Sequence, residues 1–222
     1  LGADDQINDH SFHSGYAIMA AATVAMYDPA WAAPDQWGGM VNLLIKDSNN
    51  WDRTDTQFPF LRGHAAYAGH SWAAGHGDFG DGNNQESSSE SMHFAAATLL
   101  WGAVTEQPEI RDLGIFMHAT ERTAVEDYWF DVHDETFPAD YPHVAIGMVW
   151  GTKGVHSTWF GADPEFIHGI NLLPITGGSL YLGRHPHHVR ANVAEIAKER
   201  GSAPVIWKDV IWQYHALADP DQ

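Results

Sequence analysis

The sequence contains no cysteine and few basic residues, and both absences exclude kinds of function. Without thiols the chain has no disulfide framework, no thiol nucleophile and no thiolate ligands for a metal ion. Lys and Arg number 11 against 29 Asp and Glu, so the formal net charge of the 222 residues is −18. This charge opposes binding to nucleic-acid phosphates and to anionic membrane surfaces. We therefore expect neither a nucleic-acid nor a membrane partner, and no apolar run approaches the roughly 18 residues of a membrane span.

Aromatic residues, in contrast, are abundant. Ten Trp residues and an aromatic content of 12% accompany only 18% of charged residues. Because aromatic rings present flat apolar faces, this composition favours a neutral, ring-shaped ligand. Fifteen His residues are present without a His-Glu-x-x-His pattern, so no metal ion or other cofactor is expected. The length and the lack of an interior linker predict a single unit over residues 1–222.

Apolar residues recur at helical spacing along most of the chain. The pattern predicts helices near residues 15–27, 35–46, 86–104, 110–128, 164–169, 188–200 and 205–218. The first is apolar nearly all round, which is typical of a helix buried on most sides. Thr105 is the predicted N-terminal cap of the fourth helix.

Two stretches between these helices have a different pattern. Residues 49–81 are rich in Gly, Pro, His and aromatic residues, and we predict a long irregular loop there. Residues 144–160 combine β-branched and aromatic residues with three glycines, which predicts a short β-hairpin. The predicted fold class is mainly α, with helical hairpins whose connections carry the chemistry.

The most informative segment is the run Asp-Gly-Asn-Asn-Gln-Glu-Ser-Ser-Ser-Glu-Ser at residues 81–91. It places Glu86 and Glu90 four residues apart at the predicted start of the third helix. Residues at this spacing share one helix face, where two like charges destabilise the helix. The repulsion indicates two neighbouring acids with different pKa values, which is typical of a functional site.

A third acid stands near the start of the first helix. Asp9 and His13 lie four residues apart in the segment Asn-Asp-His-Ser-Phe-His at residues 8–13. Taken alone, Asp9 is better explained as a helix cap. Combined with Glu86 and Glu90, it predicts a cleft that acids from two helices face from opposite sides.

Five segments together resemble glycoside hydrolase family 81, whose members are endo-β-1,3-glucanases. The segments are Asn8–His13, Trp37–Leu44, Tyr67–Ala73, Asp81–Glu90 and Pro164–Ile170. The resemblance implies an (α/α)6 toroid and hydrolysis with inversion of configuration. Family members carry a β-sandwich domain and a small α/β domain upstream. The chain is therefore expected to be the carboxyl-terminal part of the catalytic domain, incomplete by itself, with the missing amino-terminal part of the same enzyme as a partner.

The resemblance also implies a role for each acid. Asp9 is expected to be the general acid, Glu90 the general base, Glu86 a supporting carboxylate and His13 the partner of Asp9. An inverting glycosidase needs a protonated acid beside the leaving oxygen and a carboxylate that holds water on the opposite face. Burial and nearby glutamates would raise the pKa of Asp9, whereas a protonated His13 would lower it, and the sequence leaves the outcome open.

The same resemblance implies substrate contacts around these acids. The implied residues are Tyr16, His70, Asn84, Gln85, Lys153, Trp159 and His168, whereas Trp72 is expected to lie in the core. The expected function is endo-acting hydrolysis of β-1,3-glucan, and a polymeric substrate implies a secreted or extracellular enzyme. Two alternatives stay open at this point: a β-glucan-binding module without catalysis, and an inverting (α/α) glycosidase for another β-glucan.

Overall fold

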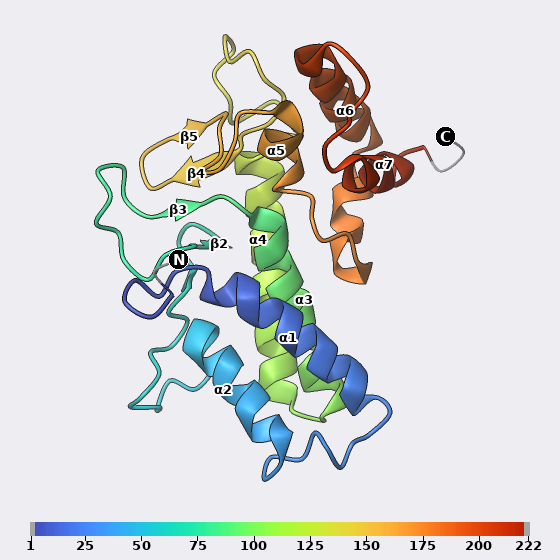
Figure 1. Cartoon of the computed structure of the whole chain (residues 1–222). Helices are drawn as coiled ribbons and strands as arrows, with labels where there is room; N and C mark the ends of the chain where they lie inside the picture. The colour runs from blue at the N-terminus through green and yellow to red at the C-terminus, as the bar shows by residue number, and fades with distance from the viewer. Residues whose placement is uncertain (1–2, 220–222) are drawn as a thin grey trace. The chain divides into compact units, whose positions relative to one another are not determined.

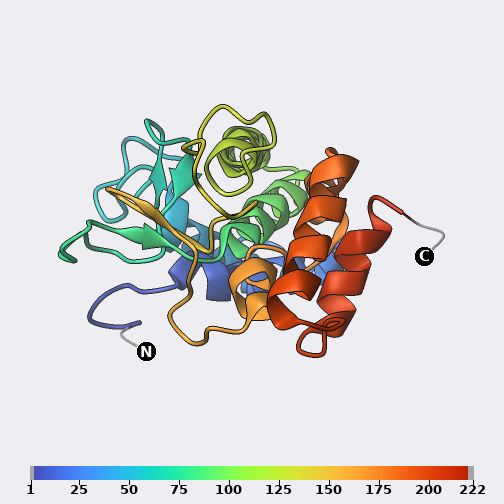
Figure 2. The ribbon, with the colours of Figure 1, turned by 90° about the horizontal axis from the view of Figure 1, so that it is seen from above.

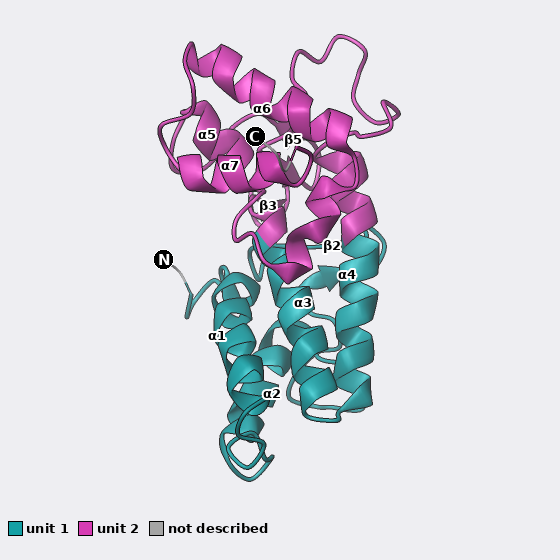
Figure 3. Cartoon of the chain, turned by 90° about the vertical axis from the view of Figure 1, so that its right-hand side faces the viewer, with its two compact units in different colours: residues 1–77, 90–121 teal, residues 78–89, 122–222 magenta. Residues whose placement is uncertain are grey.

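The computed structural model describes residues 3–219 (Figure 1). Two compact units divide the chain: unit 1 comprises residues 1–77 and 90–121, and unit 2 comprises residues 78–89 and 122–222 (Figure 3). Helices dominate, and each strand has only two or three residues. Within residues 3–219, no helix has the length and apolarity needed to cross a membrane. A single domain over residues 1–222 stays a prediction.

Four helices contribute to the apolar core of unit 1. α1 (His10–Ala25) and α2 (Trp37–Asn49) pack against each other (Figure 1). α3 (Ser88–Val104) and α4 (Pro108–Tyr128) add the parts that fall within residues 90–121. The shared core includes Ile18, Ala22, Val41, Ile45, Phe94, Trp101, Ile110 and Met117. Within each helix these side chains recur at helical spacing, which is the pattern that predicts the helices from the sequence.

Glycine allows α3 and α4 to approach each other closely. A Cβ atom at Gly114 would lie 2.3 Å from the backbone nitrogen of Leu99, and one at Gly102 would lie 2.2 Å from that of Arg111. Both separations are far below van der Waals contact, so any larger side chain would push the two helices apart.

Residues 50–77 cross unit 1 largely without regular structure, as predicted. Within them, β1 (His64–Ala65) and β2 (His70–Ser71) pair antiparallel, with His64 opposite Ser71. The fully buried carboxylate of Glu121, in α4, accepts hydrogen bonds from the Ser71 N–H at 2.9 Å and from its hydroxyl at 3.1 Å. This buried acceptor fixes the end of the loop to a helix of the same unit.

Unit 2 combines short helices with a small antiparallel sheet. The strand order is β3 (Asn84–Gln85), β4 (Met148–Trp150) and β5 (Gly154–Val155). β4 and β5 form the hairpin predicted for residues 144–160. α5 (Pro164–Gly169), α6 (Pro186–Arg200) and α7 (Lys208–Ala216) pack against one another, and the 3₁₀ helix η1 (Gly177–Gly183) contacts α6 (Figure 2).

Three buried serines anchor the start of α3 within unit 2. The hydroxyls of Ser87 and Ser89 donate to the carbonyl of Ile170 at 3.0 and 3.1 Å. The N–H and the hydroxyl of Ser88 both donate to Oδ1 of Asn171, at 3.0 and 2.9 Å. Partners more than 80 residues away therefore decide where this helix begins.

The sequence predicts all seven α-helices of residues 3–219, but two of their details are wrong. α1 is not buried on most sides, because Phe12 and Ile18 face the core while Tyr16 and Val24 are exposed. The residue predicted to cap the fourth helix, Thr105, instead follows the end of α3. Its N–H and hydroxyl donate to the carbonyl of Trp101 at 3.0 and 2.6 Å.

Two further differences arise in unit 2. The third helix begins at Ser88 rather than near residue 86, because Asn84 and Gln85 are extended and pair with β4. The helix η1 has no counterpart among the predicted elements. Its start is stabilised by a capping box between Thr176 and Ser179, a local signal that the sequence analysis missed.

Candidate active site

Asp9 occupies the N-cap position of α1, but its side chain does not cap the helix. Its backbone is left-handed (φ 60°, ψ 19°), a conformation that side chains other than Asn and Asp rarely adopt. The Asp9 N–H donates to the carbonyl of Ala73 at 2.9 Å, and the Asp9 side chain accepts a bond from Asn8 Nδ2 at 3.1 Å. The capping explanation of Asp9 is therefore excluded.

The surroundings of Asp9 raise its pKa above the ordinary value. Burial is the largest cause; His13 and His10 act in the opposite direction, and the negative charge of Glu90 adds to the increase. His13 is exposed one turn further along α1, where its N–H donates to the Asp9 carbonyl at 3.0 Å. The question that the sequence leaves open is thus decided: burial outweighs the histidines, and Asp9 holds a proton more readily than an ordinary aspartate.

Glu90 lies in the first turn of α3, where free backbone N–H groups favour a negative charge. Tyr16 of α1 donates its hydroxyl to Oε1 of Glu90 at 2.9 Å. Burial, followed by the charge of Glu90, raises the pKa of Tyr16. The Tyr16 ring lies 5.0 Å from the ring of His93. Asp9, Tyr16 and Glu90 thus form one electrostatically coupled group within unit 1.

Glu86 does not lie on α3, so the prediction that it shares a helix face with Glu90 is wrong. It stands between β3 and the helix, in unit 2, because the extended pairing of β3 with β4 continues up to Gln85. Its Oε2 accepts a hydrogen bond from the backbone N–H of Trp159 at 2.6 Å. The carboxylate thereby holds the loop that carries Trp159.

Trp159 is 58% exposed, and a second group also orients it. Its indole Nε1–H donates to Oδ1 of the buried Asn84 at 3.2 Å. The rings of Phe79 and Trp150 lie 6.0 and 5.4 Å from the Trp159 ring. An exposed indole held in this way offers an apolar face with a fixed direction, which suits a sugar ring. The sequence analysis did not predict Phe79 and Trp150 as site residues. Each is an aromatic residue in a glycine-rich segment, and this pattern was the signal that could have identified them.

Lys153 lies in the turn of the β4–β5 hairpin, with its side chain about half exposed. Its Nζ lies 2.6 Å from Oδ2 of Asp81, and the hydroxyl of Thr152 donates to Oδ1 of the same carboxylate at 3.0 Å. These two bonds lower the pKa of Asp81. Asp81 therefore fixes the position of this exposed cation.

The remaining predicted contacts are buried side chains. His70, 2% exposed, places Nδ1 3.0 Å from the carbonyl of Ser71 and packs against the partly buried Trp72, and burial lowers its pKa. Gln85 is fully buried opposite Val149 in the sheet, and His168 is 1% exposed in α5. Direct contact of these buried residues with a substrate stays a prediction.

The predicted site residues therefore fall into two groups. Asp9, His13, Tyr16, His70 and Glu90 belong to unit 1, whereas Asn84, Gln85, Glu86, Lys153, Trp159 and His168 belong to unit 2. A separate set of possible metal ligands, His143, His156 and Glu199, lies in unit 2 and includes none of the candidate acids.

Comparison with known proteins gives consistent matches over almost the whole chain. The family model described as "Glycosyl hydrolase family 81 C-terminal domain" matches residues 4–222. Glucan endo-1,3-beta-D-glucosidases from Thermobifida fusca and Acetivibrio thermocellus are 48% and 52% identical over 100% and 99% of this chain. The chain spans only 29% and 28% of the length of these two relatives.

A solved structure gives the same result. Glycoside hydrolase family 81 from Clostridium thermocellum (CtLam81A), in a mutant form, superimposes with a TM-score of 0.97 at 51% sequence identity. The match covers 99% of this chain and 31% of that chain. The mainly α fold class, of the (α/α)-toroid type, is thereby confirmed. The chain belongs to the carboxyl-terminal domain family of glycoside hydrolase family 81.

Proposed function

We propose that this chain takes part in the endo-acting hydrolysis of β-1,3-glucan by an inverting acid/base mechanism. The names of the two bacterial relatives, both glucan endo-1,3-beta-D-glucosidases, support the reaction and the polysaccharide substrate. The three acids of the sequence support catalysis over binding alone. Neither a β-glucan-binding module nor a glycosidase for another β-glucan is favoured by any match described above.

In the proposed mechanism, Asp9 is the general acid and Glu90 the general base. Asp9 gives its proton to the glycosidic oxygen while the bond from that oxygen to the anomeric carbon breaks. Glu90 removes a proton from a water molecule whose oxygen attacks the anomeric carbon from the opposite face. His13 accompanies Asp9, and Glu86 is the supporting carboxylate.

The raised pKa of Asp9 is the observation that carries this proposal. Burial favours the protonated carboxyl group more than in an ordinary aspartate, and the protonated form is the one that an acid catalyst needs before it reacts. The carboxyl group caps no helix, although its residue stands at an N-cap position. A carboxyl group that caps no helix and is not fully exposed to water is suited to proton transfer.

The hydrogen bond from Tyr16 supports the assignment of Glu90 as the base. The Tyr16 hydroxyl donates to Oε1 of this carboxylate at 2.9 Å and so restricts the orientation of the carboxylate. The other oxygen can then hold the attacking water. Exposed Trp159 and Lys153 offer an apolar face and a cationic donor for glucosyl units.

Product analysis tests the proposal most directly. We expect the longer enzyme with this sequence to release oligosaccharides from laminarin, but not from cellulose, with little product from lichenan. Proton NMR during the first minutes should show the α-anomer at the new reducing end, because inversion converts a β-linkage into an α-hemiacetal. Initial formation of the β-anomer would exclude the inverting mechanism. Calorimetric binding of laminari-oligosaccharides without any product would instead identify a binding module.

Two further proposals concern the part of the longer enzyme that this chain contacts and the location of the enzyme. Tyr27, Trp37 and Met40 expose large apolar side chains on unit 1, which supports their being covered by another part of the longer enzyme. If so, amides of α2 should exchange hydrogen more slowly in the longer enzyme than in the isolated chain. Secretion is proposed from the polymeric substrate alone, and enzyme found only inside the producing cells would contradict it.

A further inference from the structure

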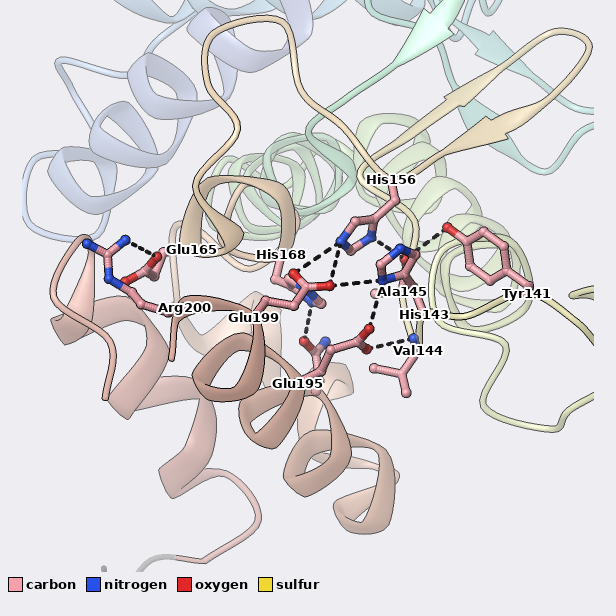
Figure 4. A network of polar contacts seen from close by, with 11 residues as sticks. Tyr141, His143, Val144, Ala145, His156, Glu165, His168, Glu195, Glu199 and Arg200 are labelled. Atoms are coloured by element: carbon pink, nitrogen blue, oxygen red, sulfur yellow. Dashed lines mark hydrogen bonds and ion pairs between the residues drawn. The ribbon is translucent and has the colours of Figure 1, made fainter. Parts of the chain in front are cut away.

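A second cluster of titratable side chains lies in unit 2 and includes none of the acids proposed for the hydrolysis; of the predicted substrate contacts it includes only the buried His168. Figure 4 shows that it gathers His143 from the segment before β4, His156 from just after β5, His168 from α5, and Glu195 and Glu199 from α6. We refer to these five residues as the His/Glu cluster. Four separate segments of unit 2 therefore meet at a single group of nitrogen and carboxylate oxygen atoms.

A backbone carbonyl determines which nitrogen of His156 carries the proton. Nδ1 lies 3.0 Å from the carbonyl oxygen of Ala145, which can only accept a hydrogen bond, so Nδ1 carries the hydrogen. The neutral ring therefore directs the lone pair of Nε2 toward Glu199, whose two oxygens both lie 3.4 Å away. A ligating histidine is commonly oriented in this way by a carbonyl on its other nitrogen.

His168 repeats this arrangement in a deeper position. Its Nδ1 lies 2.6 Å from Oδ1 of Asn192, an acceptor, so the lone pair of this ring also belongs to Nε2. The residue is 1% exposed, and its Nε2 has no hydrogen-bond partner within residues 3–219. That atom lies 3.7 Å from Oε2 of Glu199, too far for a hydrogen bond. A buried nitrogen that accepts or donates no hydrogen bond thus lies within ion-pair distance of the same carboxylate.

His143 is placed between two carboxylates. Its Nδ1 lies 2.9 Å from Oε1 of Glu195 and 2.9 Å from Oε1 of Glu199, although one nitrogen can donate only one proton. The other oxygen of Glu195 accepts the N–H of Val144 at 2.7 Å. The His143 ring stacks on the His156 ring with centroids 3.6 Å apart and an angle of 4°.

These contacts leave electron-rich atoms facing one another. In their neutral forms His156 and His168 direct the lone pairs of Nε2 toward the oxygens of Glu199. A divalent cation between these atoms would convert the repulsion into coordination bonds. We propose that His143, His156 and Glu199 bind a divalent transition-metal ion of the zinc class, with His168 as the fourth donor.

The distances fit such an ion. The ligand atoms of His143, His156 and Glu199 all lie within 4.8 Å of one another. Two ligands of a tetrahedral zinc ion are roughly 3.3 Å apart, given bond lengths of about 2.0–2.1 Å. The nitrogen-to-oxygen distances of 2.9 Å for His143, 3.4 Å for His156 and 3.7 Å for His168 bracket this value. Small side-chain rotations would complete the coordination.

The donor set also indicates the kind of metal and its role. Imidazole nitrogens with one carboxylate suit Zn²⁺ and its first-row neighbours, whereas Ca²⁺ and Mg²⁺ prefer oxygen ligands alone. Four protein ligands leave no open position for substrate, which is typical of a structural site. Bound at the His/Glu cluster, the ion would join the segment before β4, the end of β5, α5 and α6. The proposed role is thus to stabilise unit 2.

Metal titration of the full chain tests this proposal. Enzyme freed of metal with a chelator should bind one equivalent of Zn²⁺ by calorimetry, and saturation should raise Tm by about 5 °C or more. Co²⁺ in the same site should give the strong visible absorption of a four-coordinate ion. Millimolar Mg²⁺ or Ca²⁺ should produce neither effect.

Three variants separate this site from adventitious binding by other histidines. His156→Ala and Glu199→Gln should each weaken Zn²⁺ binding at least tenfold and abolish the increase in Tm. His187→Ala, which alters an exposed histidine of α6, should change neither. If His156→Ala fails to fold, Glu199→Gln still decides the question, because glutamine keeps the size and an acceptor oxygen.

Two results would overturn the proposal. One is the absence of stoichiometric Zn²⁺ binding to the folded, chelator-treated enzyme, which would leave the His/Glu cluster as a hydrogen-bond network only. The other is one-equivalent binding that persists unchanged in Glu199→Gln, which would locate the metal elsewhere. Neither result depends on hydrolysis, so the proposed function stands or falls separately.

Discussion

Units 1 and 2 hold their candidate functional residues by different means. In unit 1, Asp9 and Glu90 begin helices of 16 and 17 residues that share an apolar core. In unit 2, Glu86 and Trp159 lie in loops, between elements as short as the two residues of β3 and β5. There, buried polar side chains such as Asn171 hold the loops. A core of packed helices is sensitive to volume, whereas loops held by single polar groups are sensitive to the loss of one acceptor.

The largest expected effects are on the kinetic parameters. Substitutions of the acids in unit 1 should lower kcat, whereas a substitution in unit 2 should mainly raise KM. We expect Asp9→Asn and Glu90→Gln each to lower kcat roughly 10²–10⁴-fold, because each removes a proton-transfer group. Trp159→Ala should instead raise KM roughly tenfold with a smaller effect on kcat. Glu86→Gln should also be severely impaired, because the charged carboxylate that accepts the Trp159 N–H becomes a neutral and weaker acceptor.

Steady-state kinetics on laminarin measures both parameters. Asp112→Asn, at an exposed acid of α4, serves as the matched control and should behave as wild type. Near-normal turnover of Asp9→Asn, in a variant with an unchanged circular dichroism spectrum, would refute its role as the acid.

The next largest effect should come from volume added to the core of unit 1. Gly114→Ala places a methyl group 2.3 Å from the Leu99 backbone and should destabilise the fold by about 3 kcal/mol. Denaturant unfolding measures this loss. Gly80→Ala, in unit 2, adds the same methyl group where no atom lies within 4 Å, and the change should stay within about 0.5 kcal/mol. Equal effects of the two variants would contradict the close approach of α3 and α4.

Removal of a single hydrogen-bond acceptor in unit 2 should destabilise the fold almost as much. Asn171→Ala removes the oxygen that accepts both bonds from Ser88, and the amide that donates to the carbonyl of Gly147 at 2.9 Å. Because these groups are buried, the loss should be about 2 kcal/mol. Thermal unfolding beside the exposed variant Ser202→Ala provides the comparison. If Asn171→Ala unfolds at the wild-type temperature, polar anchors do not hold unit 2.

The smallest expected effects are on stability at neutral pH, and they should have opposite signs for an aspartate of unit 1 and one of unit 2. The raised pKa of Asp9 means that the folded chain loses stability as pH rises through that pKa, so Asp9→Asn should be slightly stabilising at neutral pH. Asp131, in unit 2, has a lowered pKa, because bonds from the N–H groups of Phe137, Thr136 and Glu135 outweigh burial. Its contribution is present above the ordinary value of 3.8 and is lost as pH falls.

Melting temperatures measured from about pH 3 to about pH 8 compare the two variants. Asp131→Asn should lower stability by about 1 kcal/mol at neutral pH, and the difference should shrink in acid. The gain from Asp9→Asn should likewise vanish below the ordinary aspartate pKa. A loss of stability in Asp9→Asn at neutral pH would show that burial does not dominate its environment.

Local patterns in the sequence predicted most of the helices and the β-hairpin. α5 was predicted near residues 164–169, which agrees with its observed ends, and Pro164 stands in the first turn, where proline is favoured. The start of α3 was placed too early because Ser87, Ser88 and Ser89 bond to residues near position 170, and no local pattern reveals a partner at that distance. Thr105 was misassigned because a hydroxyl can end one helix as well as begin the next.

The sequence by itself determined the mainly α class, the family and the candidate acids, since helical periodicity and short motifs are properties of neighbouring residues. Only the tertiary structure decided that Asp9 caps nothing and has a raised pKa, and that Glu86 lies off the helix. It also brought His143, His156, His168 and Glu199 together. Burial, pKa and ligand geometry depend on contacts between atoms of distant segments, and those contacts exist only in the folded chain.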